Sequence, residues 1–181
     1  MLLTLGILFI LLIAIYSGAR RGLILQLVMT VGYMFSFWFA LNYYEAIREP
    51  LEMIVPYPPV SLSDTFVLFT PEMSMALDTV YYNGIAFLAI LAIGWIITRL
   101  LGGLLQFVAE LPLLKQANVI GGAILNFIVN YVGVFLVLFV LSTVPLDFIQ
   151  GQFDSSSLAQ NIVANTPKLS DRIFEWWSTE F

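Results

Sequence analysis

The sequence contains no cysteine and no histidine, and charged residues make up only 10% of its 181 residues. Without cysteine there is neither a disulfide framework nor thiolate chemistry. Without histidine the chain lacks the commonest general base and the commonest metal ligand. Seven lysines and arginines against twelve acidic residues leave a net charge of −5, which excludes a basic surface for nucleic acid. Hydrolase, metalloprotease and phosphate-loop motifs are missing too, so we expect no enzymatic activity, no catalytic residue, no cofactor and no bound metal.

What the sequence does contain is apolar, with 60% hydrophobic residues and a mean hydropathy of +0.94. Soluble domains carry about 25% charged residues, so this chain has too few charged residues to form the polar surface that a soluble protein needs. A hydrocarbon core of about 30 Å needs about 20 helical residues. Four uncharged stretches meet that length, and they cover residues 1–19, 22–44, 79–98 and 116–146. The sequence therefore predicts an all-α membrane protein with four transmembrane helices.

The predicted transmembrane domain covers residues 1–146, and an extracytoplasmic amphipathic tail covers 147–181. The four helices are expected at about 1–17, 23–43, 79–98 with an extension to 110, and 119–144. Five prolines in the extracytoplasmic loop 45–78 forbid a long helix there, although 45–54 has the pattern of a short one. The tail has two short helical patterns, one before Pro167 and one after it.

Two adjacent arginines interrupt the apolar run at residues 17–22. A charge at mid-membrane costs roughly 2.5–3.5 kcal/mol on insertion scales, so the chain must leave the lipid and turn back there. Because the arginines follow the first apolar segment, a retained helix is favoured over a signal peptide. The positive-inside rule places this turn and the segment after the third helix in the cytoplasm, with both termini outside. The topology residues are Gly18, Arg20, Arg21, Gly22, Arg99 and Lys115.

Small and polar residues recur at spacings of three and four within the predicted helices. Lipid provides no hydrophobic force between helices, so such residues mark packing faces. They are Gln26, Thr30, Tyr33, Ser36, Asn83, Gly94, Gly121, Gly122, Asn126, Asn130 and Gly133. A polar path for a solute, lined by Gln26, Asn126 and Asn130, is the alternative interpretation. Transport sites usually hold an ionisable residue at depth, and none occurs in the four stretches, so packing is favoured.

Aromatic residues flank the extracytoplasmic loop and lie in the tail. Tyrosine and tryptophan are enriched where a membrane meets water, so we expect them to be interfacial anchors. They are Tyr43, Tyr44, Tyr81, Tyr82, Trp176 and Trp177.

Two segments carry a family resemblance: Tyr16-Ser17-Gly18-Ala19-Arg20-Arg21-Gly22-Leu23 before the second helix, and Asn118-Val119-Ile120-Gly121-Gly122 at the start of the fourth. In this order the chain resembles the CvpA family, the colicin V production proteins, and more closely its branch in low-GC Gram-positive bacteria. The resemblance implies a multi-pass protein of the bacterial plasma membrane with an extracytoplasmic C-terminus. It also implies a role in colicin V production or export and in envelope stress tolerance, without established catalytic residues.

Two functions remain open. One is a non-enzymatic scaffold or accessory factor that contacts a membrane or envelope protein. The other is a small transporter or channel subunit with a polar path along the second and fourth helices, which requires a homo-oligomer. Both place the protein in a lipid bilayer, and neither involves nucleic acid.

Overall fold

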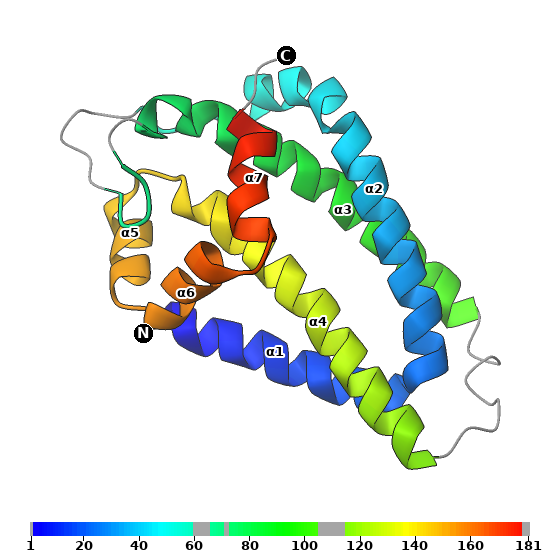
Figure 1. The fold of residues 1–181 in the computed structure, drawn as a ribbon. Coiled ribbons are helices and arrows are strands. Elements are labelled where there is room, and N and C mark those ends of the chain that lie inside the picture. Colours follow the sequence, from blue (N-terminus) through cyan, green and yellow to red (C-terminus); the bar gives the residue numbers. More distant parts are fainter. Residues whose placement is uncertain (1, 60–65, 71–72, 105–114, 179–181) are drawn as a thin grey trace. The chain divides into compact units, whose positions relative to one another are not determined.

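The computed structural model describes residues 2–59, 66–70, 73–104 and 115–178, and these form helices without strands (Figure 1). The elements in chain order are α1 (Leu2–Arg21), α2 (Leu23–Ile54), the 3₁₀ helix η1 (Met73–Ala76), α3 (Leu77–Leu104), α4 (Lys115–Ser142), α5 (Asp147–Asp154), α6 (Ser157–Asn165) and α7 (Leu169–Ser178). The first four α-helices are long and apolar enough to cross a membrane. The predicted all-α class with four such helices is confirmed.

The break between α1 and α2 is a single residue, Gly22. Its φ of +80° is one that glycine adopts without steric cost. The Gly22 N–H donates to the Gly18 carbonyl at 3.0 Å, and the Gln26 N–H donates to the Gly22 carbonyl at 3.1 Å. The turn expected over 17–22 is therefore much shorter, and Arg21 ends α1, where the helix dipole favours a cation.

Helix α2 continues through the segment that was expected to form a separate short helix. It includes 45–54 and carries Pro50 inside it. Proline removes one helical N–H donor, but here it lies only four residues before the helix ends at Ile54. The predicted extension of the third helix is helical as far as Leu104, and 105–110 lies outside the described residues.

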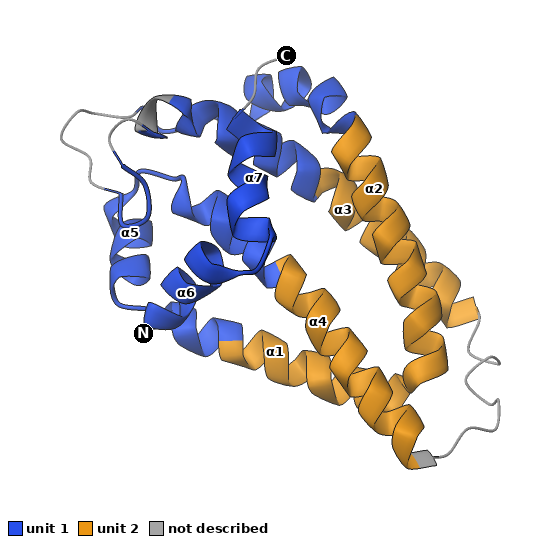
Figure 2. Cartoon of the chain, in the orientation of Figure 1, with its two compact units in different colours: residues 1–7, 43–88, 134–181 blue, residues 8–42, 89–133 orange. Residues whose placement is uncertain are grey.

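The chain forms two compact units, coloured blue and orange in Figure 2. Unit 1 contains residues 1–7, 43–88 and 134–181, and unit 2 contains 8–42 and 89–133. Each of the four long helices contributes residues to both units. The predicted tail lies in unit 1, where it forms three helices instead of two, because α5 precedes the two expected ones.

The core of unit 1 is aromatic and is built around Trp177 of α7. This side chain is completely buried, and its ring centroid lies 5.5 Å from that of Phe87 and 5.6 Å from that of Phe139. A Cβ atom on Gly84 would approach the Trp177 ring to 2.9 Å, so the glycine makes room for the indole. Trp177 is thus a core residue, which corrects the expectation that it anchors the protein at the membrane surface.

The tail is tied to the rest of unit 1 by specific polar contacts. The Ser156 hydroxyl accepts the N–H of Ala159 as the N-cap of α6 and also lies 2.7 Å from the Thr4 hydroxyl. The buried Gln150 amide donates to the carbonyls of Ser142 and Val144, at 3.0 and 2.9 Å. Ser142 is the last residue of α4 and Val144 lies two residues beyond it, so these bonds satisfy carbonyls that have no partner inside the helix.

Candidate functional site

In unit 2, two rows of residues spaced four apart bring the α1–α2 hairpin against α4. Residues four apart share one face of a helix, so the row on α4 forms a continuous line, whereas Gly18 lies in α1, Gly22 is the link and Gln26 lies in the first turn of α2. We call the two rows together the seam, and its members are Gly18, Gly22, Gln26, Asn118, Gly122, Asn126 and Asn130.

The glycines of the seam let two backbones touch. A Cβ atom on Gly18 would collide with the Gly122 carbonyl oxygen, and a Cβ on Gly122 would come within 2.5 Å of the Gly18 oxygen. Real Cβ atoms are essentially never found closer than 3.0 Å to such atoms. Close approach through small residues is how helices associate in lipid. The contact therefore requires glycine on both sides.

Asn126 is the hydrogen-bonding centre of the seam. Its Nδ2 donates to the Ala14 carbonyl of α1 at 2.6 Å, and its Oδ1 accepts from Gln26 Nε2 of α2 at 3.0 Å. The Asn130 amide donates to the same Oδ1 at 3.1 Å. Asn126 is 4% exposed and Gln26 is fully buried. One asparagine thus joins three helices. One atom of the cluster, Gln26 Oε1, is buried without a hydrogen-bond partner among the described residues.

Asn118 closes the end of the seam. Its Oδ1 accepts the N–H of Leu23 at 2.6 Å, which is the first N–H of α2 and has no partner inside the helix. An asparagine of α4 therefore caps α2. Asn118 was not among the predicted packing residues, although its four-residue spacing from Gly122 and Asn126 is visible in the sequence.

Helices α2 and α3 also contact each other through small residues of unit 2. A Cβ on Gly32 would lie 2.6 Å from the Thr98 side chain, and a Cβ on Gly94 would collide with Ser36. Ser36 and Gly94 were both predicted to pack, and the structure brings them together. The hydroxyls of Ser36 and Thr30 donate to carbonyls of their own helix at 2.9 and 2.7 Å.

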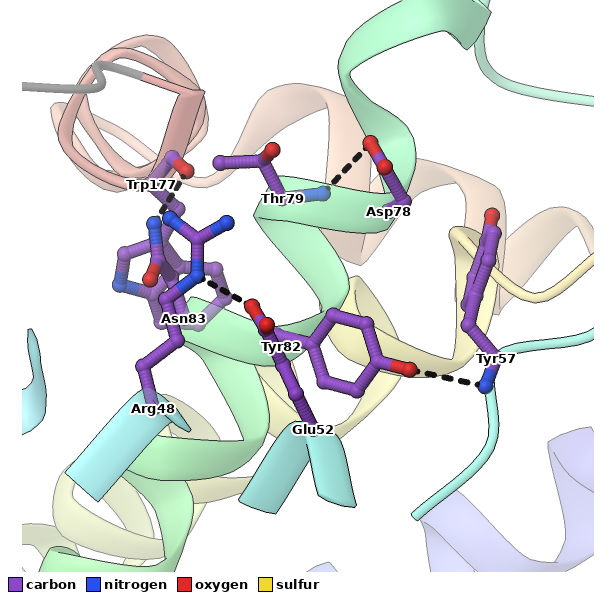
Figure 3. Close-up of polar contacts among 8 residues, drawn as sticks. All are labelled: Arg48, Glu52, Tyr57, Asp78, Thr79, Tyr82, Asn83 and Trp177. Atoms are coloured by element: carbon purple, nitrogen blue, oxygen red, sulfur yellow. Dashed lines mark hydrogen bonds and ion pairs between the residues drawn. The ribbon is translucent and has the colours of Figure 1, made fainter. Parts of the chain in front are cut away.

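The remaining predicted packing residues lie elsewhere. Gly121 contacts the Leu23 side chain, whereas a Cβ on Gly133 would meet nothing within 4 Å among the described residues. Asn83 belongs to unit 1, where its amide donates to the Trp177 carbonyl at 2.8 Å (Figure 3). Tyr33 belongs to unit 2, where it is partly exposed. The seam thus includes only some of the residues that the sequence singled out.

The predicted interfacial tyrosines connect segments of unit 1. The Tyr82 hydroxyl accepts the backbone N–H of Tyr57 at 3.0 Å, as Figure 3 shows, and the Tyr57 hydroxyl donates to the Thr143 carbonyl at 2.7 Å. The rings of Tyr57 and Tyr81 lie 4.9 Å apart. Tyr57 was not predicted as a site residue, and it ties the chain after α2 to α3 and to the end of α4.

Two other members of that predicted set differ in exposure. Tyr43 is exposed, whereas Tyr44 is 5% exposed, and its hydroxyl donates to the Trp176 carbonyl at 3.0 Å. Trp176 itself is only partly exposed. Burial of Tyr44 corrects its assignment as a surface anchor, because its ring packs 6.4 Å from that of Phe87.

The basic residues of unit 2 stand at helix ends or near them. Arg20 lies over the Tyr16 ring at 5.9 Å, and Arg99 lies over the Trp95 ring at 5.0 Å. Lys115 is the first residue of α4. The described part of unit 2 includes no aspartate or glutamate. Arg20 and Arg99 therefore face aromatic rings, and no carboxylate in that part is available to pair with them.

Comparison with known proteins agrees with this picture. The model of the family described as Colicin V production protein matches residues 3–167. An uncharacterized transmembrane protein of Bacillus subtilis (strain 168), YshB, is 36% identical over 172 residues, which is 95% of each chain. No solved structure matches the chain. With its four apolar helices and this match over nearly its whole length, the chain is a membrane protein that belongs to the colicin V production protein family.

Proposed function

We propose that the protein is a non-enzymatic scaffold or accessory factor of the bacterial plasma membrane that acts in toxin production or export and in envelope homeostasis. The observation that carries this proposal is the bonding of Asn126. Both polar atoms of its side chain are engaged, one by α1 and the other by α2 and α4. An amide used in this way supports fixed helix packing. The seam also contains no ionisable side chain, so it offers no proton donor, base or nucleophile for catalysis.

The orientation belongs to the same proposal. Arg20 and Arg21 end α1, Arg99 lies in the last two turns of α3 and Lys115 begins α4. A cytoplasmic location of these four residues places both termini outside. Because the chain has no cysteine, a single Gly103→Cys or Ser157→Cys variant can be labelled selectively. A membrane-impermeant maleimide added to intact cells should react at Ser157→Cys and not at Gly103→Cys, and the reverse pattern would contradict the orientation.

A gene deletion in the host bacterium tests the role. We expect the deletion to lower secreted bacteriocin activity and to increase sensitivity to envelope stress, with both restored by the wild-type chain. A deletion that changes neither property contradicts the proposal.

A transporter or channel subunit is the second candidate, and Gln26 favours it. Its Oε1 is a buried acceptor without a partner among the described residues, as expected of a group that receives a passing donor. Proteoliposomes containing the full chain distinguish the two functions. The scaffold proposal expects fluxes of Na⁺, K⁺ and H⁺ no greater than in empty liposomes. A flux that Asn126→Leu abolishes, with an unchanged circular dichroism spectrum, would favour the transporter instead.

A further inference from the structure

Two large apolar side chains of unit 1, Leu146 and Phe148, are exposed just beyond the end of α4. Their exposed fractions are 46% and 73%. Ser142 is the last residue of α4, so these two side chains follow the end of an apolar helix by only four and six residues. Leu146 directly precedes α5 and Phe148 is the second residue of that helix. We call the two residues together the α5 tip.

Hydrogen bonds hold α5 against the end of α4. Gln150 Nε2 donates to the carbonyls of Ser142 and Val144 at 3.0 and 2.9 Å, and its Oε1 accepts the backbone N–H of Val67 at 3.1 Å. All three partners belong to unit 1, and the Gln150 side chain is buried. The first turns of α5 therefore stay beside the last carbonyls of α4, and the α5 tip stays there with them.

Phe148 lies on the side of α5 that is opposite to its packed face. At about 100° per residue, Gln150 and Phe153 lie about 160° and 140° around the helix from Phe148, and both are buried. The carboxylates of Asp147 and Asp154 are exposed and lie about 100–120° from the ring, both on the same flank. Helix α5 thus has one face packed into unit 1, an acidic flank, and a phenyl ring that points away from the core.

The α5 tip lies at the level where α4 leaves the lipid. Helix α4 is long and apolar enough to cross a membrane, and no charged residue occurs between Lys115 and Asp147. Val137, in the last two turns of α4, is still 46% exposed, as a side chain that faces lipid would be. The headgroup region adds roughly 5–8 Å on each side of the hydrocarbon core. Side chains bonded this closely to the end of α4 fall within that layer.

We infer that the α5 tip inserts into the boundary between headgroups and acyl chains and anchors this end of the protein to the lipid surface. Apolar side chains gain free energy by leaving water, and helices with one apolar and one charged side lie in the plane of this boundary. The acidic flank of α5 stays in water at the same time. The tip thereby provides the anchor that the sequence had assigned to Tyr44 and Trp177, which are buried. This inference holds for a scaffold and for a transporter, and for either orientation of the chain.

Spin labelling in liposomes tests the inference, because the chain has no cysteine of its own. The full chain with Phe148→Cys and a nitroxide label is reconstituted in phosphatidylcholine. Power saturation then compares collisions with oxygen, which concentrates in lipid, and with a nickel chelate, which stays in water. The label at position 148 should lie about 5–10 Å below the lipid surface. Asp154→Cys is the matched control, since it ends the same helix on the acidic flank, and its label should collide more with the nickel chelate.

Equal access of the nickel chelate to both labels would overturn the inference, because the tip would then lie in water. Poor access of both reagents at position 148 would also overturn it and would identify a protein surface, such as a second copy of the chain, as the cover of the tip. The wild-type chain allows an independent measurement. A phospholipid with a diazirine near the start of its acyl chain should crosslink to residues 146–148 on illumination. Absence of the adduct from that segment, mapped by proteolysis and mass spectrometry, would contradict the anchor.

Discussion

Replacing Gly122 with alanine tests the backbone contact of the seam. The new Cβ would lie 2.5 Å from the Gly18 oxygen and 2.7 Å from the Gly22 carbonyl carbon, whereas ordinary contacts begin at 3.4 Å. Both neighbours are backbone atoms, so the α1–α2 hairpin must move away from α4 by about 1 Å. Overpacking of this kind costs about 1–3 kcal/mol. The movement also stretches the bonds of Asn126, each contributing about 0.6 kcal/mol in a membrane protein.

Gly133→Ala is the matched control, because it lies in the same helix and unit and its Cβ would meet nothing within 4 Å of the described residues. Alanine is a better helix former than glycine by up to about 1 kcal/mol, so the control should be unchanged or slightly stabilised. Gly122→Ala should lower the free energy of unfolding by about 1–3 kcal/mol.

The assay is equilibrium unfolding of the purified chain in mixed micelles with increasing dodecyl sulfate, followed by circular dichroism. The reasoning would be refuted if Gly122→Ala were as stable as Gly133→Ala. Gly18→Ala should also be destabilising, and the double variant should lose less than the two single losses together, because both substitutions separate the same contact.

Three further predictions use the same unfolding assay. Asn126→Leu should lower the free energy of unfolding by about 1–3 kcal/mol, because the Ala14 carbonyl of α1 and the Gln26 amide of α2 both lose their hydrogen-bond partner. A variant as stable as wild type would refute the role of Asn126 as the hydrogen-bonding centre of the seam. Asn118→Ala should lose about 0.5–2 kcal/mol through loss of the α2 cap, and Asn118→Asp should retain most of the stability because a carboxylate also accepts an N–H. Trp177→Ala should lose about 3–5 kcal/mol, whereas Trp176→Ala, on the partly exposed side of α7, should lose much less, and equal losses would count against a core position for Trp177.

The helices of this chain were predictable because their physical cause is local. Bilayer thickness and the cost of burying charge require uncharged runs of about 20 residues, and such runs are visible in the sequence. The same reasoning misplaced the end of α2, because the helix continues through Pro50 to Ile54, although Met53 is 82% exposed and Ile54 74%. A proline near a helix end removes only one N–H donor, and the sequence alone does not reveal whether the helix stops before the proline or continues past it.

The seam was partly visible and partly hidden. Gln26 and Asn126 attract notice because polar residues are rare among apolar ones, and the structure joins them by a hydrogen bond. The cap from Asn118 to Leu23 was hidden, because a helix boundary at Gly22 had first to be known before the free N–H could be identified. Trp177 was misjudged because an amphipathic helix with two tryptophans looks the same whether it covers a membrane surface or a protein core.

The one-residue link at Gly22 has a consequence for biogenesis. Two arms joined so tightly are delivered to the insertion machinery as a single hairpin, so neither arm can reverse its direction without the other. The residue that completes the link, Asn118, follows Leu23 by 95 positions. At a translation rate of about 5–20 residues per second, it emerges roughly 5–20 s later. The hairpin therefore exists without this cap until α4 has been made, and until then water has to accept the first N–H of α2.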